Sequence, residues 1–299
     1  MSLFLSNVTK KFGEDIAVNE LNLEIPSQEL FGFLGGNGAG KTTTFRMILG
    51  LIDQTEGDIT WKGKELNYKN SDIIGYLPEE RGLYPKLKVK DQLIYLGKLR
   101  GMTKQAASTE IDSWLDRFQI SHYLHKQVEE LSKGNQQKIQ FISAVLHRPE
   151  LLILDEPFSG LDPINVEMLK EAVLDLKEGG TTIVFSSHQM DHVEEMCEHL
   201  CILRKGDAVV KGDLTEIKRS FGKKNLIIHA DQSLELLQDY PGVVAYKQVI
   251  GGCELQIENE AVSQRILEQL QGNLFIRKFE LEEPSLNDIF IEKVGESYE

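Results

Sequence analysis

Two segments of the sequence carry residue types that bind phosphate, and the first is "GGNGAGKT", residues 35–42. It fits the spacing G-x-x-x-x-G-K-[ST] at Gly35, Gly40, Lys41 and Thr42. Glycines let the backbone turn tightly, so that several N–H groups point at phosphate oxygens, and a following helix adds its positive end. Lys41 then reaches the β- and γ-phosphates, and the Thr42 hydroxyl is a ligand for Mg²⁺. The motif predicts nucleotide binding; a plain glycine-rich turn is the alternative.

The second segment is "LSKGNQQK", residues 131–138, which stands just ahead of an apolar helical pattern. Ser132 is typical of a helix N-cap, and Ser132, Gly134 and the helix start behind them offer hydrogen-bond donors and a dipole to an anion. Taken alone, the segment reads as an ordinary polar helix cap. A chain with two phosphate-binding segments so far apart needs an explanation for the second.

An acidic pair follows another apolar run, "LLILDEP", which includes Asp155 and Glu156. At the carboxyl end of a buried strand, Asp155 is placed to hold Mg²⁺ through water. Glu156, one residue further, can polarise an attacking water molecule. The alternative is a strand that ends in a solvated acidic turn, and the upstream phosphate loop argues against it.

Strand-like and helix-like segments alternate up to about residue 212 and position these groups. The apolar runs 30–34, 151–155 and 181–187 predict buried strands. Helices are predicted at 42–51 and 163–180, with Pro163 in the first turn and Gly179 at the end. Buried strands separated by helices predict an α/β domain with a largely parallel sheet covered on both sides.

The chain changes character after residue 212, and residues 213–299 carry 16 acidic and 9 basic side chains without further glycine-loop motifs. Their pattern predicts a β-α-β-β-α-β order, a small ferredoxin-like α+β domain. We therefore expect a domain at 1–212, with a helical subdomain at about 90–150, and an accessory domain at 213–299. The predicted elements of that domain are strands at 225–230, 243–249, 253–257 and 274–281, and helices at 233–240, 261–270 and 285–294.

Charge and cysteine content exclude several classes of protein. A net charge of -14 and a pI near 5.1 disfavour a nucleic-acid binder, which needs a basic face. Three cysteines do not suit a disulfide framework and indicate a reducing compartment. We expect no signal peptide and no membrane span, so that any role at a membrane depends on a partner. The cluster of His192, Cys197, His199 and Cys201 lacks a usual zinc spacing and is expected to be a helix-to-strand core segment.

The segments "GGNGAGKTT", "LSKGNQQK", "LLILDEPFSGLDP" and "VFSSH", in that order, resemble the nucleotide-binding subunit of an ATP-binding-cassette (ABC) transporter over about residues 1–212. The resemblance implies a P-loop ABC ATPase domain with a helical subdomain that binds ATP and Mg²⁺. Members work as head-to-tail pairs, with each ATP between the phosphate loop of one copy and the signature loop of the other. A second copy, or a similar subunit, would explain the second phosphate-binding segment.

The resemblance also implies roles for single residues. Phe12 would stack on adenine, unless it is a core residue, and His188 would face the γ-phosphate. Asp162 would communicate across the dimer and can also be the N-cap of the next helix. Glu79 stands where the family has glutamine, which senses Mg²⁺ and the attacking water, and a carboxylate there could bind the metal. The remaining nucleotide-binding positions implied are Asn37, Gly38, Thr43, Ser132, Gly134 and Asn135, of which Asn135, like neighbouring Lys133, departs from the common signature LSGGQ.

The function implied is that of an ATPase subunit that powers a separate integral-membrane permease from the cytoplasmic face of the cell membrane. The loop around Glu79 to Leu87, with Arg81, Tyr84 and Pro85, would touch that permease. The fuller pattern is similar to bacterial exporter ATPases of the sodium-extrusion and drug-efflux group. The alternatives are a soluble ABC protein of translation or DNA maintenance, disfavoured by a single cassette without a coiled coil, and a regulatory binder, disfavoured by intact catalytic motifs.

Overall fold

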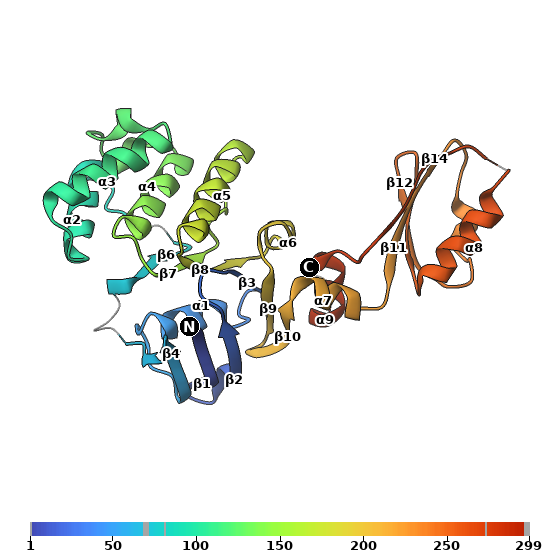
Figure 1. The fold of residues 1–299 in the computed structure, drawn as a ribbon, viewed down its shortest axis with the longest axis horizontal. Coiled ribbons are helices and arrows are strands. Elements are labelled where there is room, and N and C mark those ends of the chain that lie inside the picture. Colours follow the sequence, from blue (N-terminus) through green and yellow to red (C-terminus); the bar gives the residue numbers. More distant parts are fainter. Residues whose placement is uncertain (1, 68–71, 81, 273, 296–299) are drawn as a thin grey trace. The chain divides into compact units, whose positions relative to one another are not determined.

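A computed structural model describes residues 2–67, 72–80, 82–272 and 274–295 of the chain, so Arg81 lies outside the described residues (Figure 1). The chain divides into two compact units, Met1–Lys211 and Gly212–Glu299. None of the helices in the described ranges combines the length and the apolar character needed to span a bilayer.

A six-stranded sheet with the order β10-β9-β3-β8-β7-β6 forms the centre of the first unit. Strand β3 (Leu30–Gly35) lies between β8 (Thr182–Ser187) and β9 (His199–Arg204), and β7 (Leu151–Asp155) lies between β8 and β6 (Ile74–Leu77), all with parallel pairing. Every residue of β3, β7 and β8 is buried, which agrees with the buried strands that the apolar runs predict. β10 spans Asp207–Asp213.

Helices follow three of these strands in the chain. α1 (Lys41–Ile48) follows β3 across the phosphate loop, α5 (Pro163–Glu178) connects β7 to β8, and α6 (Met190–Met196) connects β8 to β9. Pro163 occupies the first turn of α5 and Gly179 caps its end, as the sequence predicts. Cys197 and Cys201 are buried at the end of α6 and in β9, which agrees with the expected core segment.

An antiparallel sheet at the start of the chain was not anticipated from the sequence. It has the order β2-β1-β4-β5, with β1 (Leu3–Phe12) antiparallel to both β2 (Asp15–Ile25) and β4 (Glu56–Trp61), and β5 is Lys64–Glu65. Leu3 and Leu5 alternate with exposed residues and pack with Phe45 of α1 in one core. The expectation of strand–helix alternation from the first residue is therefore wrong, because this sheet buries one face and exposes the other.

Three helices form a separate layer of the first unit: α2 (Val89–Leu99), α3 (Lys104–Arg117) and α4 (Lys133–Val145). Trp114 of α3 and Phe118, which directly follows α3, pack with Phe141 of α4, with ring centroids between 5.7 and 5.9 Å apart. This aromatic contact fixes α4, and with it the segment around Ser132 at the start of the helix.

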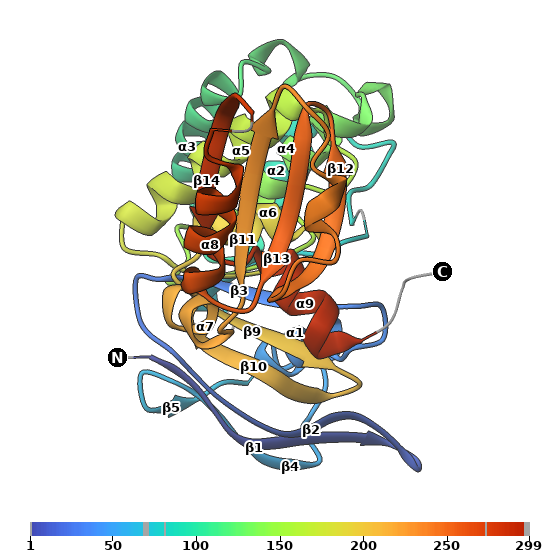
Figure 2. The ribbon, with the colours of Figure 1, turned by 90° about the vertical axis from the view of Figure 1, so that its right-hand side faces the viewer.

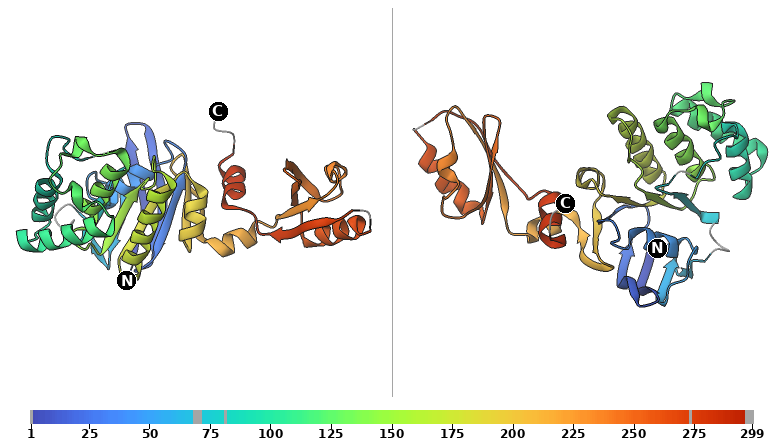
Figure 3. Two further views of the ribbon diagram at one scale, coloured as in Figure 1. Left: turned by 90° about the horizontal axis from the view of Figure 1, so that it is seen from above. Right: turned by 180° about the vertical axis from the view of Figure 1, so that it is seen from behind.

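The second unit is a four-stranded antiparallel sheet with the order β12-β13-β11-β14 (Figure 2). The strands are β11 (Lys224–Ala230), β12 (Val243–Val249), β13 (Gly252–Ile257) and β14 (Ile276–Glu282). α8 (Glu260–Leu270) packs on one face of this sheet (Figure 3). Helices α7 (Leu214–Ser220) and α9 (Leu286–Val294) precede and follow it in the chain. The four predicted strands are found in the predicted order along the chain.

The prediction of a helix at 233–240 is wrong. The segment contains only a 3-10 turn, Glu235–Leu237, followed closely by Pro241 and Gly242. Leu234 and Leu237 reach the core from this single turn, so their apolar spacing does not require a full helix. The spacing i, i+3 is common to both kinds of helix, which is why the pattern misleads.

Candidate active site

The phosphate loop connects β3 to α1 and holds Lys41 inside it. Gly38 and Gly40 have φ values of 75° and 107°, and a Cβ at Gly40 would lie 2.5 Å from the carbonyl oxygen of Ala17, so only glycine fits there. The buried Lys41 Nζ donates to the carbonyl oxygens of Gly35, at 2.5 Å, and Gly36, at 3.3 Å. The loop thus surrounds an ammonium group with backbone.

A chain of hydrogen bonds connects the carboxyl ends of neighbouring strands to the loop. Thr42 Oγ1 lies 3.1 Å from Asp155 Oδ2, and Ser186 Oγ donates to Asp155 Oδ1 at 2.6 Å. Ser186 Oγ also accepts from the backbone N–H of Glu156 at 3.0 Å. Because β3, β8 and β7 are parallel neighbours, these groups converge at one edge of the sheet.

Glu156 and His188 form a close pair at the same edge. His188 Nδ1 lies 2.8 Å from Glu156 Oε2, and Glu156 has a φ of 51°, which turns its side chain away from the direction a regular strand would give. Burial raises the pKa of Glu156, while the charges of His188 and Lys41 act in the opposite direction. A carboxylate with a raised pKa, held against an imidazole, is suited to accept a proton.

Three carboxylates lie close enough to Lys41 to affect its pKa. Burial lowers the pKa of Lys41, and the negative charges of Glu156, Asp155 and Glu79 oppose that shift. Glu79, an exposed residue after β6, therefore belongs to the same electrostatic site as the phosphate loop.

Two glutamines of α4 that the sequence analysis missed tie this helix to the site. Gln140 Nε2 donates to the carbonyl oxygens of Pro78, at 3.1 Å, and Glu80, at 3.2 Å, on both sides of Glu79. Gln137 Nε2 donates to the carbonyl oxygen of Pro157 at 3.1 Å. Both side chains are buried beside the apolar residues Ile139, Phe141 and Ile142 of α4, and polar residues within that apolar stretch were the available signal.

The segment 131–138, called the signature segment from here on, makes its contacts away from the phosphate loop. Ser132 is the N-cap of α4 and accepts from the N–H of Asn135 at 3.4 Å. Gly134 lies against Asn165, which donates to the N-cap Asp162 through its backbone N–H, at 3.0 Å, and through Nδ2. These hydrogen bonds lower the pKa of Asp162. Within the described ranges, no hydrogen bond or ion pair joins Ser132–Asn135 to the Lys41 loop.

Phe12 is 52% exposed at the end of β1, so it is not a core residue. Lys10 Nζ lies over its ring, 5.0 Å from the centroid, and donates to the carbonyl oxygen of Asp53 at 2.6 Å. Of the remaining predicted positions, Asn37 is exposed in the phosphate loop and Thr43 is half-buried in α1.

The residues present fit a nucleotide with Mg²⁺. A hydroxyl and a carboxylate, from Thr42 and Asp155, lie side by side, and Mg²⁺ prefers such oxygen donors. In the described ranges, no group of three or more His, Cys, Asp or Glu side chains could hold a metal ion. A Mg²⁺ ion here would therefore share Thr42 and Asp155 with phosphate oxygens, as such ions usually do.

Comparison with known proteins agrees with this geometry. The family described as ABC transporter matches residues 18–159, and a family described as the C-terminal domain of DrrA1-3-like ATP-binding proteins matches residues 212–294. Over 99% of its length the chain is 66% identical to the whole of an uncharacterized ABC transporter ATP-binding protein, YhaQ, of Bacillus subtilis. The chain belongs to the ATP-binding subunits of ABC transporters.

Other relatives of this ABC subunit point the same way. It is 32% identical to the bacitracin transport ATP-binding protein BcrA of Bacillus licheniformis, covering 97% of this chain and 96% of that protein. A solved ATP-binding subunit of an ABC transporter matches with a TM-score of 0.69 and 29% identity over 74% of this chain and 94% of that one. ABC ATPase domains hydrolyse ATP, and such subunits dimerise and pair with membrane permease components. These relatives favour transport over a role in translation or DNA maintenance.

Proposed function

We propose that two copies of this chain, or one copy and a similar subunit, bind ATP and Mg²⁺ head to tail. Each reaction site would consist of the Lys41 loop of one copy and the Ser132 segment of the other. The observation that carries the proposal is the division of the phosphate-binding groups. Lys41 and Thr42 converge with Asp155, while Ser132, in the part of the chain that the structure describes, forms hydrogen bonds only within its own segment.

Hydrolysis uses the groups at the edge of the parallel sheet. Thr42 and Asp155 would hold Mg²⁺, and the ion would supply positive charge next to the phosphates. Lys41 donates to the β- and γ-phosphates in place of loop carbonyls. Glu156 takes a proton from water, the water oxygen bonds to the γ-phosphorus, and the bond to the bridging oxygen breaks to give ADP and phosphate. His188 lies 2.8 Å from Glu156 and keeps that carboxylate oriented.

The remaining residues position the nucleotide and its environment. Phe12 offers an exposed ring to adenine, and Asn37, Gly38 and Thr43 complete the loop. Glu79 would reach the metal or its water from the loop in which the carbonyl oxygens of Pro78 and Glu80 accept hydrogen bonds from Gln140. Asp162 communicates between the two copies. It accepts a hydrogen bond from Asn165, the residue against which Gly134 lies. Gly134 and Asn135 extend the donor set of Ser132 toward the opposite γ-phosphate.

The work done by hydrolysis is export through a separate integral-membrane permease, with the chain bound at the cytoplasmic face of the membrane. The loop from Glu79 toward Leu87 transmits the conformational change that accompanies hydrolysis to that permease. Tyr84 and Leu87 in this loop are exposed. Support for export of a drug-like compound comes from the bacitracin transport protein among the relatives. Sodium ions are the alternative cargo.

Mixing two inactive variants tests the shared site. One variant, Lys41→Ala, lacks a working phosphate loop, and the other, Ser132→Arg, lacks a working signature segment. In a mixed pair, one site has both groups intact, so we expect the mixture to hydrolyse ATP although neither variant does alone. The control is Thr103→Arg, which removes a comparable N-cap from α3 and should stay active. An inactive mixture of folded, ATP-dependent dimers would refute a site shared between copies.

A further inference from the structure

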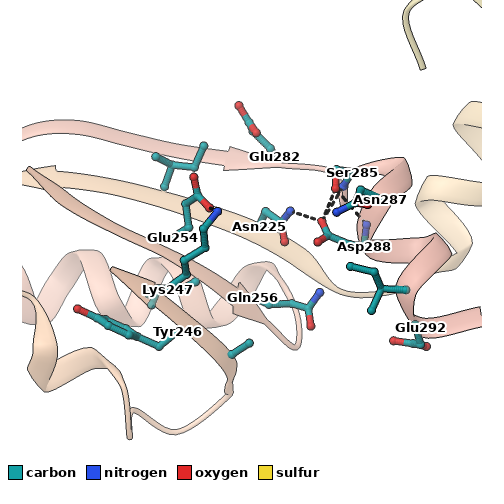
Figure 4. A pocket seen from close by; sticks show the side chains of 14 residues that line it. Asn225, Tyr246, Lys247, Glu254, Gln256, Glu282, Ser285, Asn287, Asp288 and Glu292 are labelled. Carbon is teal, nitrogen blue, oxygen red and sulfur yellow. Dashed lines mark hydrogen bonds and ion pairs between the residues drawn. The ribbon is translucent and has the colours of Figure 1, made fainter. Parts of the chain in front are cut away.

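Within the described residues of the second unit, α8 covers one face of the four-stranded sheet and leaves the other face uncovered by that helix. α8 covers the face that buries Leu226 and Leu255, and polar residues that include Asn225, Glu254 and Gln256 alternate with them on the opposite face. A cavity of about 580 Å³ lies on that opposite face, between β11, β12, β13 and the start of α9 (Figure 4). All the residues that line it belong to this unit. The residues that line it include Asn225, Tyr246, Lys247, Glu254, Gln256 and Asp288.

The cavity combines apolar contact surface with carboxylates. Ile227 and Ala245 lie on the sheet, and Ile291 of α9 is 59% exposed beside them. Four carboxylates but only one lysine stand among the lining residues. The carboxylates are those of Glu254, Glu282, Asp288 and Glu292, and the lysine is Lys247.

Two of these carboxylates form ion pairs with lysine, and for the other two the described residues give none. Lys247 Nζ lies 2.8 Å from Glu254, and Lys223 Nζ lies 2.5 Å from Glu292. No lysine or arginine among the described residues forms an ion pair with Glu282 or Asp288. The cavity therefore retains negative charge after its internal pairing.

Asp288 is also held in a fixed position. Its Oδ2 accepts from Asn225 Nδ2 at 2.8 Å, from the Ser285 N–H at 3.0 Å and from Ser285 Oγ at 2.7 Å (Figure 4). Such a carboxylate loses little freedom when a cation binds to it. An ordered anion beside exposed apolar surface suits a ligand that carries both a cation and an apolar side chain.

We infer that this open sheet face binds a cytoplasmic segment of the membrane permease that presents lysine or arginine beside an apolar residue. Cytoplasmic loops of membrane proteins carry an excess of lysine and arginine, which complements the charge of the cavity. A second copy would place the same carboxylates opposite one another, and like charges in contact oppose association. The inference rests on the proposed function in one respect, that the partner is a separate permease.

Site-directed photo-crosslinking in the full chain tests the inference. p-Benzoylphenylalanine replaces Gln256 in the cavity, or Asn287 as a second position, and replaces Gln264 of α8 as the matched control. After irradiation of cells, the cross-linked peptides are identified by mass spectrometry. We expect both cavity positions, and not Gln264, to capture a lysine- or arginine-bearing cytoplasmic segment of a multi-span membrane protein.

Charge reversal adds a quantitative arm to this experiment. Adding Glu282→Lys should lower the yield of that adduct about tenfold, because an attraction becomes a repulsion at the cavity. Glu268→Lys on α8 makes the same change in net charge and should leave the yield unchanged.

Several results would overturn the inference: adducts to a second copy or to residues 1–211, equal yields at Gln264, or no membrane-protein adduct from either cavity position. ATP hydrolysis is measured on every variant in parallel. A chain that hydrolyses ATP but forms no permease adduct removes only the docking inference, whereas a chain without hydrolysis contradicts the proposed function itself.

Discussion

Replacing Glu156 by glutamine separates the chemical step from nucleotide binding. The substitution keeps the shape of the side chain and an oxygen that can accept from the His188 N–H, which lies 3.4 Å from Oε2. Among the described residues, the Asp155–Thr42 pair and the loop around Lys41 make no hydrogen bond to the Glu156 side chain, so the binding groups remain in place. What is lost is the proton acceptor.

Loss of a positioned general base typically costs about 10²–10⁴-fold in rate, or about 3–5 kcal/mol of activation free energy. We therefore expect Glu156→Gln to bind ATP and to accumulate as an ATP-bound dimer. Its phosphate release should be slower than that of the wild type by about a hundredfold or more. Glu171→Gln, on the exposed side of α5, is the control and should behave as wild type.

The assays are single-turnover phosphate release and size-exclusion chromatography with MgATP. The pH profile adds a second readout: because burial raises the pKa of Glu156, wild-type hydrolysis should fall as pH drops through that raised pKa, and the residual rate of the variant should lack this acid limb. Turnover near the wild-type rate, or loss of ATP binding, would refute the role given to Glu156.

Three further predictions concern the same structure. Ser132→Arg should abolish hydrolysis while the ATP affinity of the monomer, measured by calorimetry, stays within about twofold, because Ser132 would serve the opposite site. Ser186→Ala removes the hydrogen bonds to buried Asp155 Oδ1 and from the Glu156 N–H, so urea denaturation should show a loss of about 2 kcal/mol in the free energy of unfolding, which Ser186→Thr restores. Burial lowers the pKa of His147 from 6.5 to about 4, so the folded state binds fewer protons than the unfolded state between these pH values. The contribution of His147 to the free energy of unfolding should therefore be complete above pH 6.5 and fall by at most about 3 kcal/mol toward pH 4. In His147→Gln the free energy of unfolding should depend less on pH.

Sequence spacing predicted the groups that lie close together along the chain or at strand ends. Lys41 and Thr42 follow from a local glycine pattern, and Asp155 and Glu156 from the end of an apolar run. Parallel strands bring such ends to one edge, so their convergence could be expected before the fold was known.

Groups that act through tertiary contacts could not be predicted in this way. Ser186 matters because its hydroxyl lies between Asp155 and the Glu156 N–H, and Gln140 because its amide reaches the backbone beside Glu79. Neither partner is near in sequence. The open sheet face of the second unit, and the fixed carboxylate of Asp288 beside it, likewise depend on strand order and on where α9 begins.

The most direct test of the central claim is the specific ATPase activity of the wild-type chain as a function of its concentration, with the molar mass measured by light scattering in the same samples. Because each reaction site would need two chains, activity per chain should vanish on dilution and rise to a plateau as the dimer forms. Full activity per chain at concentrations where only monomer is present would contradict the account.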